Sequence, residues 1–389
     1  MRIQGGNIFT EKGEFKKGDL TVFGGKIEEL NFTLYENTTG VVDDEQVIDA
    51  RDLYVLPGLV DIHMHGAVDV DFCDATTEEL AAIEDYQVQN GITTIFPATM
   101  TLPEEKLCRI LETAANFVGK HSQGAICGIT MEGPFLSCKK KGAQEEQYIC
   151  APDMSLFKAL QQKSGDLIYQ VAIAPEVKGA MEFIREISKQ TVVSLAHSAA
   201  DYETAKKAFM EGANHVTHLF NGMEPFLHRE PGIVGAASDN HNVFVELICD
   251  GVHIHPSMVR AMFEMFGADR ICMISDSISA TGMMDGEYTL GGQKVIKKDK
   301  MATLENGTIA GSVCNLYDCL KTSVQQMKIP LEEAILACTK NPAKSLKADN
   351  KCGILKEGRN ADILILDKDL NIKYVIKNGQ IITERGYNV

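Results

Sequence analysis

The stretch 56-LPGLVDIHMHG-66 places two histidines, His63 and His65, at the end of an apolar run. Side chains two residues apart on a strand point to the same face, so both imidazoles face one direction. Two imidazoles on one face are what a metal ion needs from a pair of ligands. Taken alone, the pair is equally typical of polar residues at a strand end, so the choice between the two depends on the rest of the chain.

Apolar runs alternate with amphipathic stretches through the middle of the chain. The alternation predicts buried parallel strands covered by helices on their outer faces. Eight such units over about 250 residues predict an α/β fold with a (β/α)8 TIM-like barrel. The eight candidate strands span residues 59–63, 93–98, 126–132, 168–174, 191–197, 215–220, 243–248 and 271–276, and the clearest helical stretches span 76–91, 155–165, 201–213 and 255–267.

The two ends of the chain resemble each other and differ from the middle. Residues 1–57 and 350–389 consist of short β-type runs separated by Gly- and Asn-containing turns. Since domain termini are often close together, we expect one small β-sandwich domain built from both ends. The catalytic barrel then spans 58–349, with a hairpin insertion at about 286–311 between the eighth strand and the final helices.

Composition limits the partners. The 389 residues are 44% hydrophobic, enough for a large core, and carry 54 acidic and 38 basic residues for a net charge of −16. Such a negative surface argues against nucleic acid and against an anionic membrane as partners. An anionic substrate would therefore need local positive charge.

The 11 cysteines are scattered, with no CxxC pair, which indicates reduced thiols. The first residues, MRIQGGNIFT, lack the apolar core of a signal peptide, and no apolar run is long enough to cross a bilayer. We therefore expect a soluble cytoplasmic protein.

Residues of the metal-binding types lie at the ends of the candidate strands. Barrels of this class carry their active sites at the carboxyl ends of the strands. Each residue alone is also typical of a hydrogen-bonded structural position, and Asp276 alone of a helix cap. Their joint occurrence at five strand ends favours a site for Zn²⁺ or Fe²⁺. These residues are His63, His65, Glu132 in MEGP, His197 in LAHS, His218 in VTHL and Asp276 in ISDS, with His253 following the seventh strand in DGVH.

Several motifs in this order resemble the amidohydrolase superfamily and, within it, the family of N-acetylglucosamine-6-phosphate deacetylases. The resemblance covers nearly the whole chain, and MEGPF followed by HLFNGM and the aspartate of SDSISATG is its most specific part. It implies metal-dependent hydrolysis of the N-acetyl group of N-acetylglucosamine 6-phosphate in amino-sugar catabolism or cell-wall recycling. The motifs are LPGLVDIHMHG, MEGPFL, LAHS, THLFNGM, DGVH and SDSISATG, with the closing segments KNPAKSLK and GRNADILILD.

The resemblance also implies roles for the strand-end residues. Glu132, His197 and His218 would form the shared metal site. His63 and His65 would allow a second ion, with Glu132 bridging and Asp276 as a further ligand. We therefore expect one or two divalent ions per subunit, Zn²⁺ or Fe²⁺ first, with Co²⁺ or Mn²⁺ as alternatives. Asp276 is expected to act as the base and proton donor, and His253 to hydrogen-bond the carbonyl oxygen of the substrate.

Substrate contacts are expected from two loops. The loop 221–232 supplies Arg229 for the phosphate, with Asn221 and the backbone around Gly222 as further donors. A solvated surface arginine is the alternative for Arg229. Because relatives place the site at a subunit interface, we expect a homodimer in which Arg229 or His228 acts on the neighbour's ligand. Gln144 stands where some relatives have a histidine, and it can hydrogen-bond a sugar hydroxyl or the acetyl group without supplying charge.

Three other interpretations stay open. The first is a deacetylase for N-acetylgalactosamine 6-phosphate, which differs at one hydroxyl. The second is another amidohydrolase, although cyclic-amide enzymes usually need a metal-bridging lysine at a strand end and none of the eight candidates ends in lysine. The third is an inactive barrel acting as a binding scaffold, which would be expected to lose the base or the ligands that this chain keeps.

Overall fold

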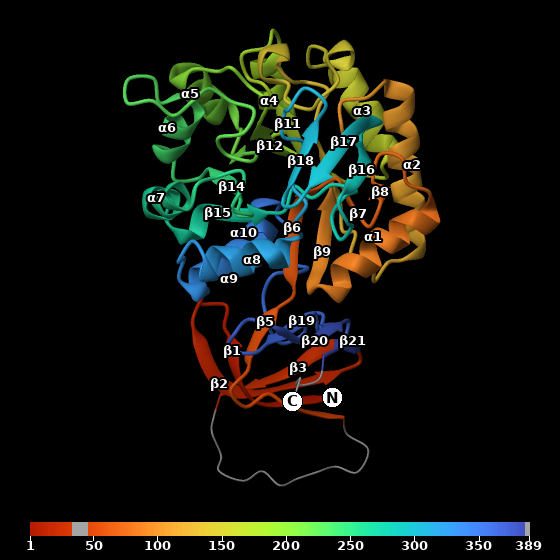
Figure 1. The fold of residues 1–389 in the computed structure, drawn as a ribbon, viewed down its shortest axis with the longest axis vertical. Coiled ribbons are helices and arrows are strands. Elements are labelled where there is room, and N and C mark those ends of the chain that lie inside the picture. The colour runs from red at the N-terminus through yellow and green to blue at the C-terminus, as the bar shows by residue number, and fades with distance from the viewer. Residues whose placement is uncertain (33–45, 386–389) are drawn as a thin grey trace.

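The middle of the chain forms a ring of eight parallel strands in the computed structural model, which describes residues 1–32 and 46–385 (Figure 1). The six strands β10 to β15 pair in chain order, β6 pairs with β9, and parallel bridges join β9 to β10. The backbone N–H of Asp276, just past β15, donates to the carbonyl of His63 in β6 at 2.9 Å, which closes the ring.

All eight predicted strands are present, although several are shorter than their apolar runs. Their side chains are almost all buried, which matches strands covered on both faces. The strands are β6 (Leu59–Met64), β9 (Ile92–Pro97), β10 (Ile129–Met131), β11 (Ile168–Ile173), β12 (Val192–Leu195), β13 (His215–Val216), β14 (Phe244–Ile248) and β15 (Ile271–Ile274).

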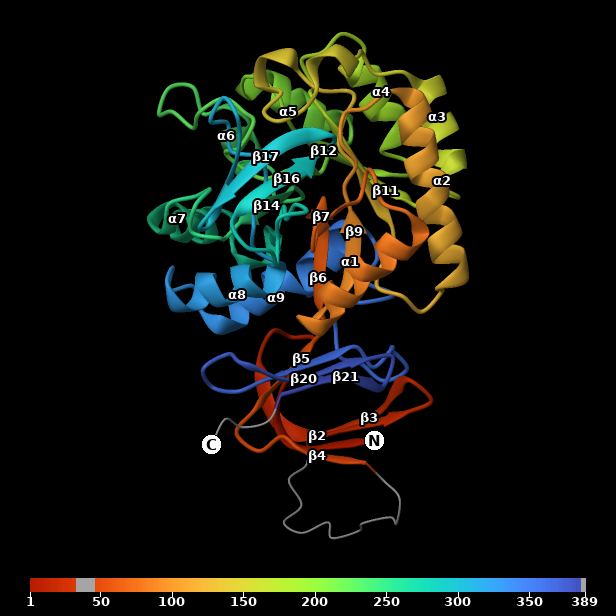
Figure 2. The ribbon, with the colours of Figure 1, turned by 45° about the vertical axis from the view of Figure 1, so that its right-hand side comes forward.

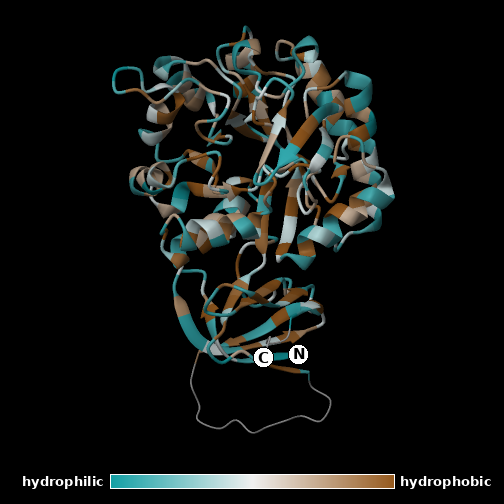
Figure 3. Ribbon diagram, viewed as in Figure 1, coloured by the Kyte–Doolittle hydropathy of each residue, from teal (hydrophilic) through white to brown (hydrophobic). Residues whose placement is uncertain are grey.

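Helices surround the ring and turn their polar faces outward, as the hydropathy colouring shows (Figure 3). Local signals set their ends: Thr76 and Glu79 form a capping box at the start of α1, and Asp201 caps α5. The helices are α1 (Thr77–Gln89), α2 (Glu104–Lys120), α3 (Met154–Lys163), α4 (Ala180–Ile187), α5 (Tyr202–Glu211), α6 (Gly232–Ser238), α7 (Pro256–Phe266), α8 (Leu316–Gln325), α9 (Leu331–Cys338) and α10 (Lys340–Ser345). No described helix is both long enough and apolar enough to span a membrane.

Strands from both ends of the chain share one eight-stranded sheet below the barrel (Figure 2). Its order is β21-β20-β19-β5-β1-β2-β3, with β4 beside β1. Apolar side chains from both ends of the chain form its own core. The boundaries at 57/58 and 349/350 stay predictions, and residues 33–45 and 386–389 of the predicted segments lie outside the described residues. The strands are β1 (Arg2–Phe9), β2 (Phe15–Phe23), β3 (Lys26–Asn31), β4 (Val47–Asp49), β5 (Tyr54–Pro57), β19 (Ile363–Leu366), β20 (Ile372–Lys377) and β21 (Gln380–Glu384).

The segment predicted as a hairpin at 286–311 forms a three-stranded antiparallel sheet, one strand more than a hairpin. It consists of β16 (Gly286–Leu290), β17 (Gln293–Lys298) and β18 (Met301–Leu304). This sheet lies in front of the upper half of the barrel (Figures 1 and 2). It brings Leu290, Thr308 and Ile309 to the lining of the cavity described next.

Candidate active site

Three of the predicted site residues share an unusual backbone conformation. The strands β12, β13 and β15 each end two residues before His197, His218 and Asp276, whose φ angles are +46°, +26° and +50°. A left-handed conformation in a residue other than glycine costs roughly 1–3 kcal/mol and is concentrated at functional sites. The same turn at three strand ends aims the three side chains at one cavity.

Glu132, His197 and His218 form the first buried group of ligand-type side chains. Their candidate ligand atoms all lie within 4.8 Å of one another, with Glu132 Oε1 at 3.1 Å from His197 Nε2 and 3.0 Å from His218 Nε2. His197 Nδ1 donates to the carbonyl of Lys140, which turns Nε2 toward Glu132. Burial opposes ionisation of Glu132, but the charge and hydrogen bonds of the imidazoles outweigh it and hold its pKa well below the usual range.

His63, His65 and Asp276 form a second buried group beside the first. Asp276 Oδ1 lies 3.3 Å from His65 Nε2. The two groups meet at Glu132, whose Oε1 is 3.7 Å from His63 Nε2 and whose Oε2 is 3.5 Å from His65 Nε2. The structure thus brings all six predicted metal ligands together, with the Glu132 carboxylate between the two groups.

Asp276 is held as a carboxylate at the edge of the cavity. Burial raises the pKa of Asp276, but its hydrogen bond with His65 and the charges of the nearby imidazoles outweigh this, so the pKa is lowered from its ordinary value. Its side chain also lines the cavity, where a reacting molecule would lie. The carboxylate form needed for a base is therefore the favoured one.

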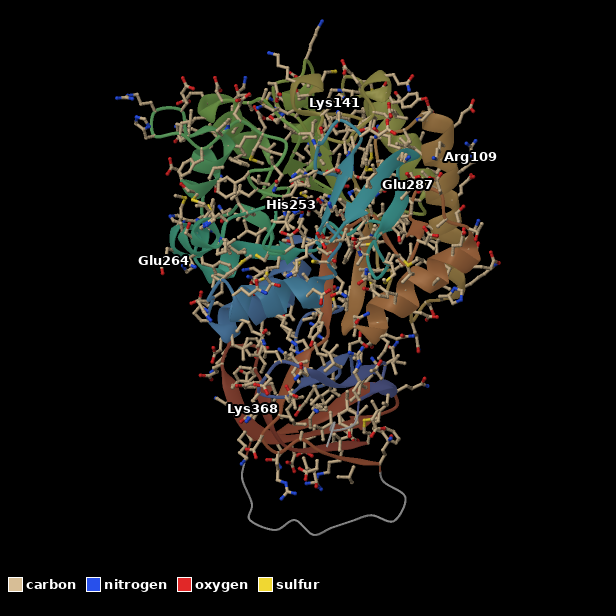
Figure 4. The ribbon with its side chains drawn as sticks, in the orientation of Figure 1. Arg109, Lys141, His253, Glu264, Glu287 and Lys368 are labelled. Carbon is tan, nitrogen blue, oxygen red and sulfur yellow. The ribbon has the colours of Figure 1, made fainter. Side chains whose placement is uncertain are left out.

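His253, labelled in Figure 4, lines the same cavity. It is oriented by Asp250, which the sequence does not single out. Asp250 Oδ2 accepts from His253 Nδ1 at 2.8 Å, and Asp250 Oδ1 accepts from the His253 backbone N–H. Burial lowers the pKa of His253, but the hydrogen bond and charge of Asp250 outweigh it and raise that pKa. In the sequence, the only indication of this contact is that Asp250 lies three positions before His253 in DGVH.

The cavity has a volume of about 290 Å³ and its lining includes Gln144, Asn221 and Gly222. Gln144 uses its amide within the protein: Nε2 donates to Glu132 Oε2 at 2.6 Å, and Oε1 accepts from the backbone N–H of Thr101. The Asn221 amide donates to the carbonyl of His218. Their contacts with substrate stay predictions.

Gly222 occupies a position that only glycine fits. Its φ is +60°, and a Cβ there would lie 2.8 Å from His197 Nδ1. The close approach lets the loop after β13 pass directly over an imidazole of the first group. This packing explains the glycine in the HLFNGM motif without a role in binding.

Arg229 does not reach the cavity of its own subunit. It is exposed on the loop after β13, where its guanidinium donates to His228 Nε2 at 2.7 Å. No lysine or arginine occurs among the described residues that line the cavity. Lys141 is half-buried and donates to the carbonyl of Gln144 at 3.4 Å.

The amino-acid sequence is similar to those of known proteins over most of their length. The model of the amidohydrolase family matches residues 54–382. The chain belongs to the amidohydrolase family. This amidohydrolase is 36% identical to the N-acetylglucosamine-6-phosphate deacetylase of Lysinibacillus sphaericus over 86% of its own length and 87% of the relative's. It is 32% identical to that of Bacillus subtilis, over 96% and 95%. It is also 32% identical to the N-acetylgalactosamine-6-phosphate deacetylase of Escherichia coli O157:H7, over 86% and 89%.

Solved structures agree with the predicted fold class. The amidohydrolase superposes on the N-acetylglucosamine-6-phosphate deacetylase of Thermotoga maritima with a TM-score of 0.89 and 30% identity, covering 99% of this chain and 100% of that one. A mutant deacetylase from Mycobacterium smegmatis, solved with N-acetyl-D-glucosamine-6-phosphate, gives a TM-score of 0.91 and 29% identity over 98% and 99%. The barrel with a small β-sheet domain is thereby confirmed.

Proposed function

We propose that this amidohydrolase hydrolyses the N-acetyl group of N-acetylglucosamine 6-phosphate, giving acetate and glucosamine 6-phosphate, in amino-sugar catabolism or cell-wall recycling. The observation that carries the proposal is the convergence of two ligand groups on Glu132 beside the ionised Asp276. The identity to deacetylases over most of the chain supports the same substrate. An inactive scaffold would have no need to keep the base and every ligand.

The residues fit divalent metal ions. His63 Nε2 is fully buried, has no hydrogen-bond partner among the described residues, and lies toward Glu132 and Asp276. Glu132, His197 and His218 would hold one ion, and His63, His65 and Asp276 a second, with Glu132 contacting both. Imidazole and carboxylate ligands suit Zn²⁺ or Fe²⁺ first, and also Co²⁺ or Mn²⁺. When bound, such an ion lowers the pKa of water and polarises a carbonyl group.

Asp276 and His253 would move and stabilise charge during hydrolysis. Asp276 accepts a proton at its carboxylate from the water that attacks the amide carbon, then delivers it to the departing nitrogen. Asp250 occupies His253 Nδ1, so Nε2 is the nitrogen left to donate to the amide oxygen as it becomes negative. The products are one carboxylic acid and one amine, and the proton passes through Asp276.

Phosphate is commonly bound by lysine or arginine, and the described residues that line the cavity include neither. We infer a homodimer in which the loop carrying Arg229 and His228 reaches the cavity of the second copy. The exposure of this loop supports the inference. Lys141, bonded to the backbone of Gln144 at the cavity lining, is the alternative source of charge within one subunit.

A reducing compartment, the cytoplasm, is the proposed location. All eleven cysteines lie within the described residues, and none forms a disulfide there. Five of them are fully buried, where desolvation raises the pKa of the thiols and keeps them protonated and unreactive; these are Cys73, Cys249, Cys272, Cys319 and Cys338.

Acetate release from three sugars tests the proposed activity. The sugars are N-acetylglucosamine 6-phosphate, its galactosamine epimer, and N-acetylglucosamine without phosphate as control. We expect the highest kcat/KM for the first and the lowest for the unphosphorylated sugar. A higher kcat/KM for the epimer would favour the second candidate, the activity of the Escherichia coli relative. Failure to release acetate from any of them would overturn the deacetylase assignment.

A further inference from the structure

Glu246 is a buried acid that the proposed reaction does not use. It lies in β14, whose other residues are apolar, and its side chain is fully buried in the barrel. A carboxylate in such a place costs several kcal/mol unless its oxygens are paired. Its contacts therefore indicate why an acid is present.

Three donors and one further imidazole surround the two oxygens of Glu246. Oε2 accepts from His63 Nδ1 at 3.2 Å and from the backbone N–H of His218 at 3.1 Å. Oε1 accepts from Gln170 Nε2 at 3.0 Å and lies 3.2 Å from His215 Nε2. An ionised carboxylate accepts only, so this set of donors fits the anion and no other form.

The bond to His63 decides which ring nitrogen faces the metal groups. Because Glu246 Oε2 can only accept, Nδ1 of His63 carries a proton in this bond, and the neutral ring that binds a metal then has its lone pair on Nε2. Nε2 is the buried, unpartnered atom that lies 3.7 Å from Glu132 Oε1 and 3.9 Å from Asp276 Oδ1. The ring is thus preset as a ligand.

Glu246 Oε2 also contacts a residue of the first group of ligand-type side chains, Glu132, His197 and His218. The backbone N–H that it accepts belongs to His218, where the chain adopts its positive φ of +26°. One carboxylate oxygen therefore joins a side chain of the second group to the backbone of the first. Among the described residues, Glu246 alone makes both of these contacts.

We propose that Glu246 is a positioning residue that fixes His63 as a ligand of the second ion and ties that ligand to the backbone of His218. The inference rests on the two-ion site proposed above. Outer partners of metal-binding histidines typically contribute about 10–100-fold to metal affinity. Glu246→Gln keeps the size of the side chain but leaves one acceptor oxygen for three donors.

The test measures bound zinc per subunit against free zinc in wild type and Glu246→Gln, with Co²⁺ spectra as a second readout. We expect the variant to bind its second ion about 10–100-fold more weakly, with the first ion changed much less. Gln170→Met is the matched control, because it removes a donor from the other carboxylate oxygen without touching His63. It should keep both ions at wild-type affinity.

The outcomes separate the two proposals. Two ions at wild-type affinity in Glu246→Gln would overturn the role of Glu246 alone. One ion in wild type at saturating zinc would overturn the two-ion site and this inference with it. If Glu246→Gln does not fold, ¹⁵N spectra of zinc-loaded wild type, with His63→Asn to assign the signal, replace it. They should show the His63 proton on Nδ1, and a proton on Nε2 would overturn the proposal.

Discussion

At the scale of single residues, Asp276 is the side chain to which we assign both a ligand and an acid–base function. Asp276 contacts His65 through Oδ1 and lines the cavity, so it belongs both to the second ligand group and to the space where substrate would lie. Its backbone N–H and its positive φ fix its direction. Removing its charge should therefore affect turnover more than folding.

Asp276→Asn tests the assignment of the base. Asparagine keeps the size of the side chain but cannot accept a proton, so kcat should fall by about 10²–10⁴-fold with little change in KM. Acetate release and metal content are measured on the same preparation. The ion at Glu132, His197 and His218 should remain, and near-normal turnover with metal bound would contradict the role of Asp276.

The Asp250–His253 pair predicts a pH dependence of stability. The pKa of His253 is raised in the folded protein, so its contribution is complete below about pH 6.5 and is lost as pH rises through the folded value. The pKa of Asp250 is lowered, so its contribution is present above about pH 3.9 and is lost as pH falls through the folded value. The pair therefore stabilises most between these two values.

Urea denaturation of wild type and His253→Gln measures this window. The difference in free energy of unfolding should be largest near pH 5 and smaller at pH 9. A difference that grows with pH above 7 would contradict the direction assigned to the His253 pKa.

At the scale of elements, the ends of the strands and the loops after them shape the site. The loop after β13 crosses His197 at Gly222, and the loop after β14 carries Asp250 and His253. The segment that follows β18 supplies Ile309 to the cavity. The backbone N–H of Ser198, just past β12, donates to the carbonyl of Gly222 in the loop after β13. A change in one loop should therefore alter a ligand on another strand.

Gly222→Ala tests this dependence. The left-handed φ costs alanine about 1–2 kcal/mol, and its Cβ would lie 2.8 Å from His197 Nδ1. We expect lower stability together with weaker binding of the first ion, measured by urea denaturation and zinc titration. Gly24→Ala is the matched control, because its φ is +57° with nothing within 4 Å of the added Cβ. It should lose stability and keep its metal affinity; equal affinities in both variants would contradict the coupling.

The periodicity of apolar residues predicted the strands and helices. The position of the polar residues at the ends of those strands predicted the ligands. Strand-end residues of parallel strands meet at one edge, so His197 and His218 followed from their places in the chain. The contact of Glu246 with His63 was not predicted, because it joins two strands that are far apart in sequence and are brought together only when the barrel closes. Its signal was an acid inside an otherwise apolar strand. The third strand of the 286–311 insertion was not predicted, because the residues after the first hairpin turn show no second clear alternation of apolar and polar residues.

At the scale of the whole molecule, charge and assembly decide how an anionic substrate binds. The net charge of −16 opposes a sugar phosphate, and the described lining of the cavity holds no lysine or arginine. The exposed loop with Arg229 lies outside its own cavity. A second copy is therefore the expected source of the missing cation.

Arg229→Ala tests this expectation. A hydrogen bond to a charged group contributes about 1.5–3 kcal/mol, so KM for the phosphorylated sugar should rise roughly 10–100-fold. The KM for N-acetylglucosamine without phosphate should not change. Arg185→Ala, which removes an exposed arginine paired with Glu211 on α4 and α5, is the control and should leave both values unchanged. Sedimentation checks for the dimer, and an unchanged KM in Arg229→Ala would contradict the role of the loop.

Zinc titration of the metal-stripped protein, with bound ions and acetate release from N-acetylglucosamine 6-phosphate followed in the same samples, addresses the six converging side chains directly. We predict no acetate release from the stripped protein and recovery as the site at Glu132, His197 and His218 fills. His218→Ala should neither fill that site nor recover. Full activity in the stripped protein, or wild-type recovery in His218→Ala, would contradict the account.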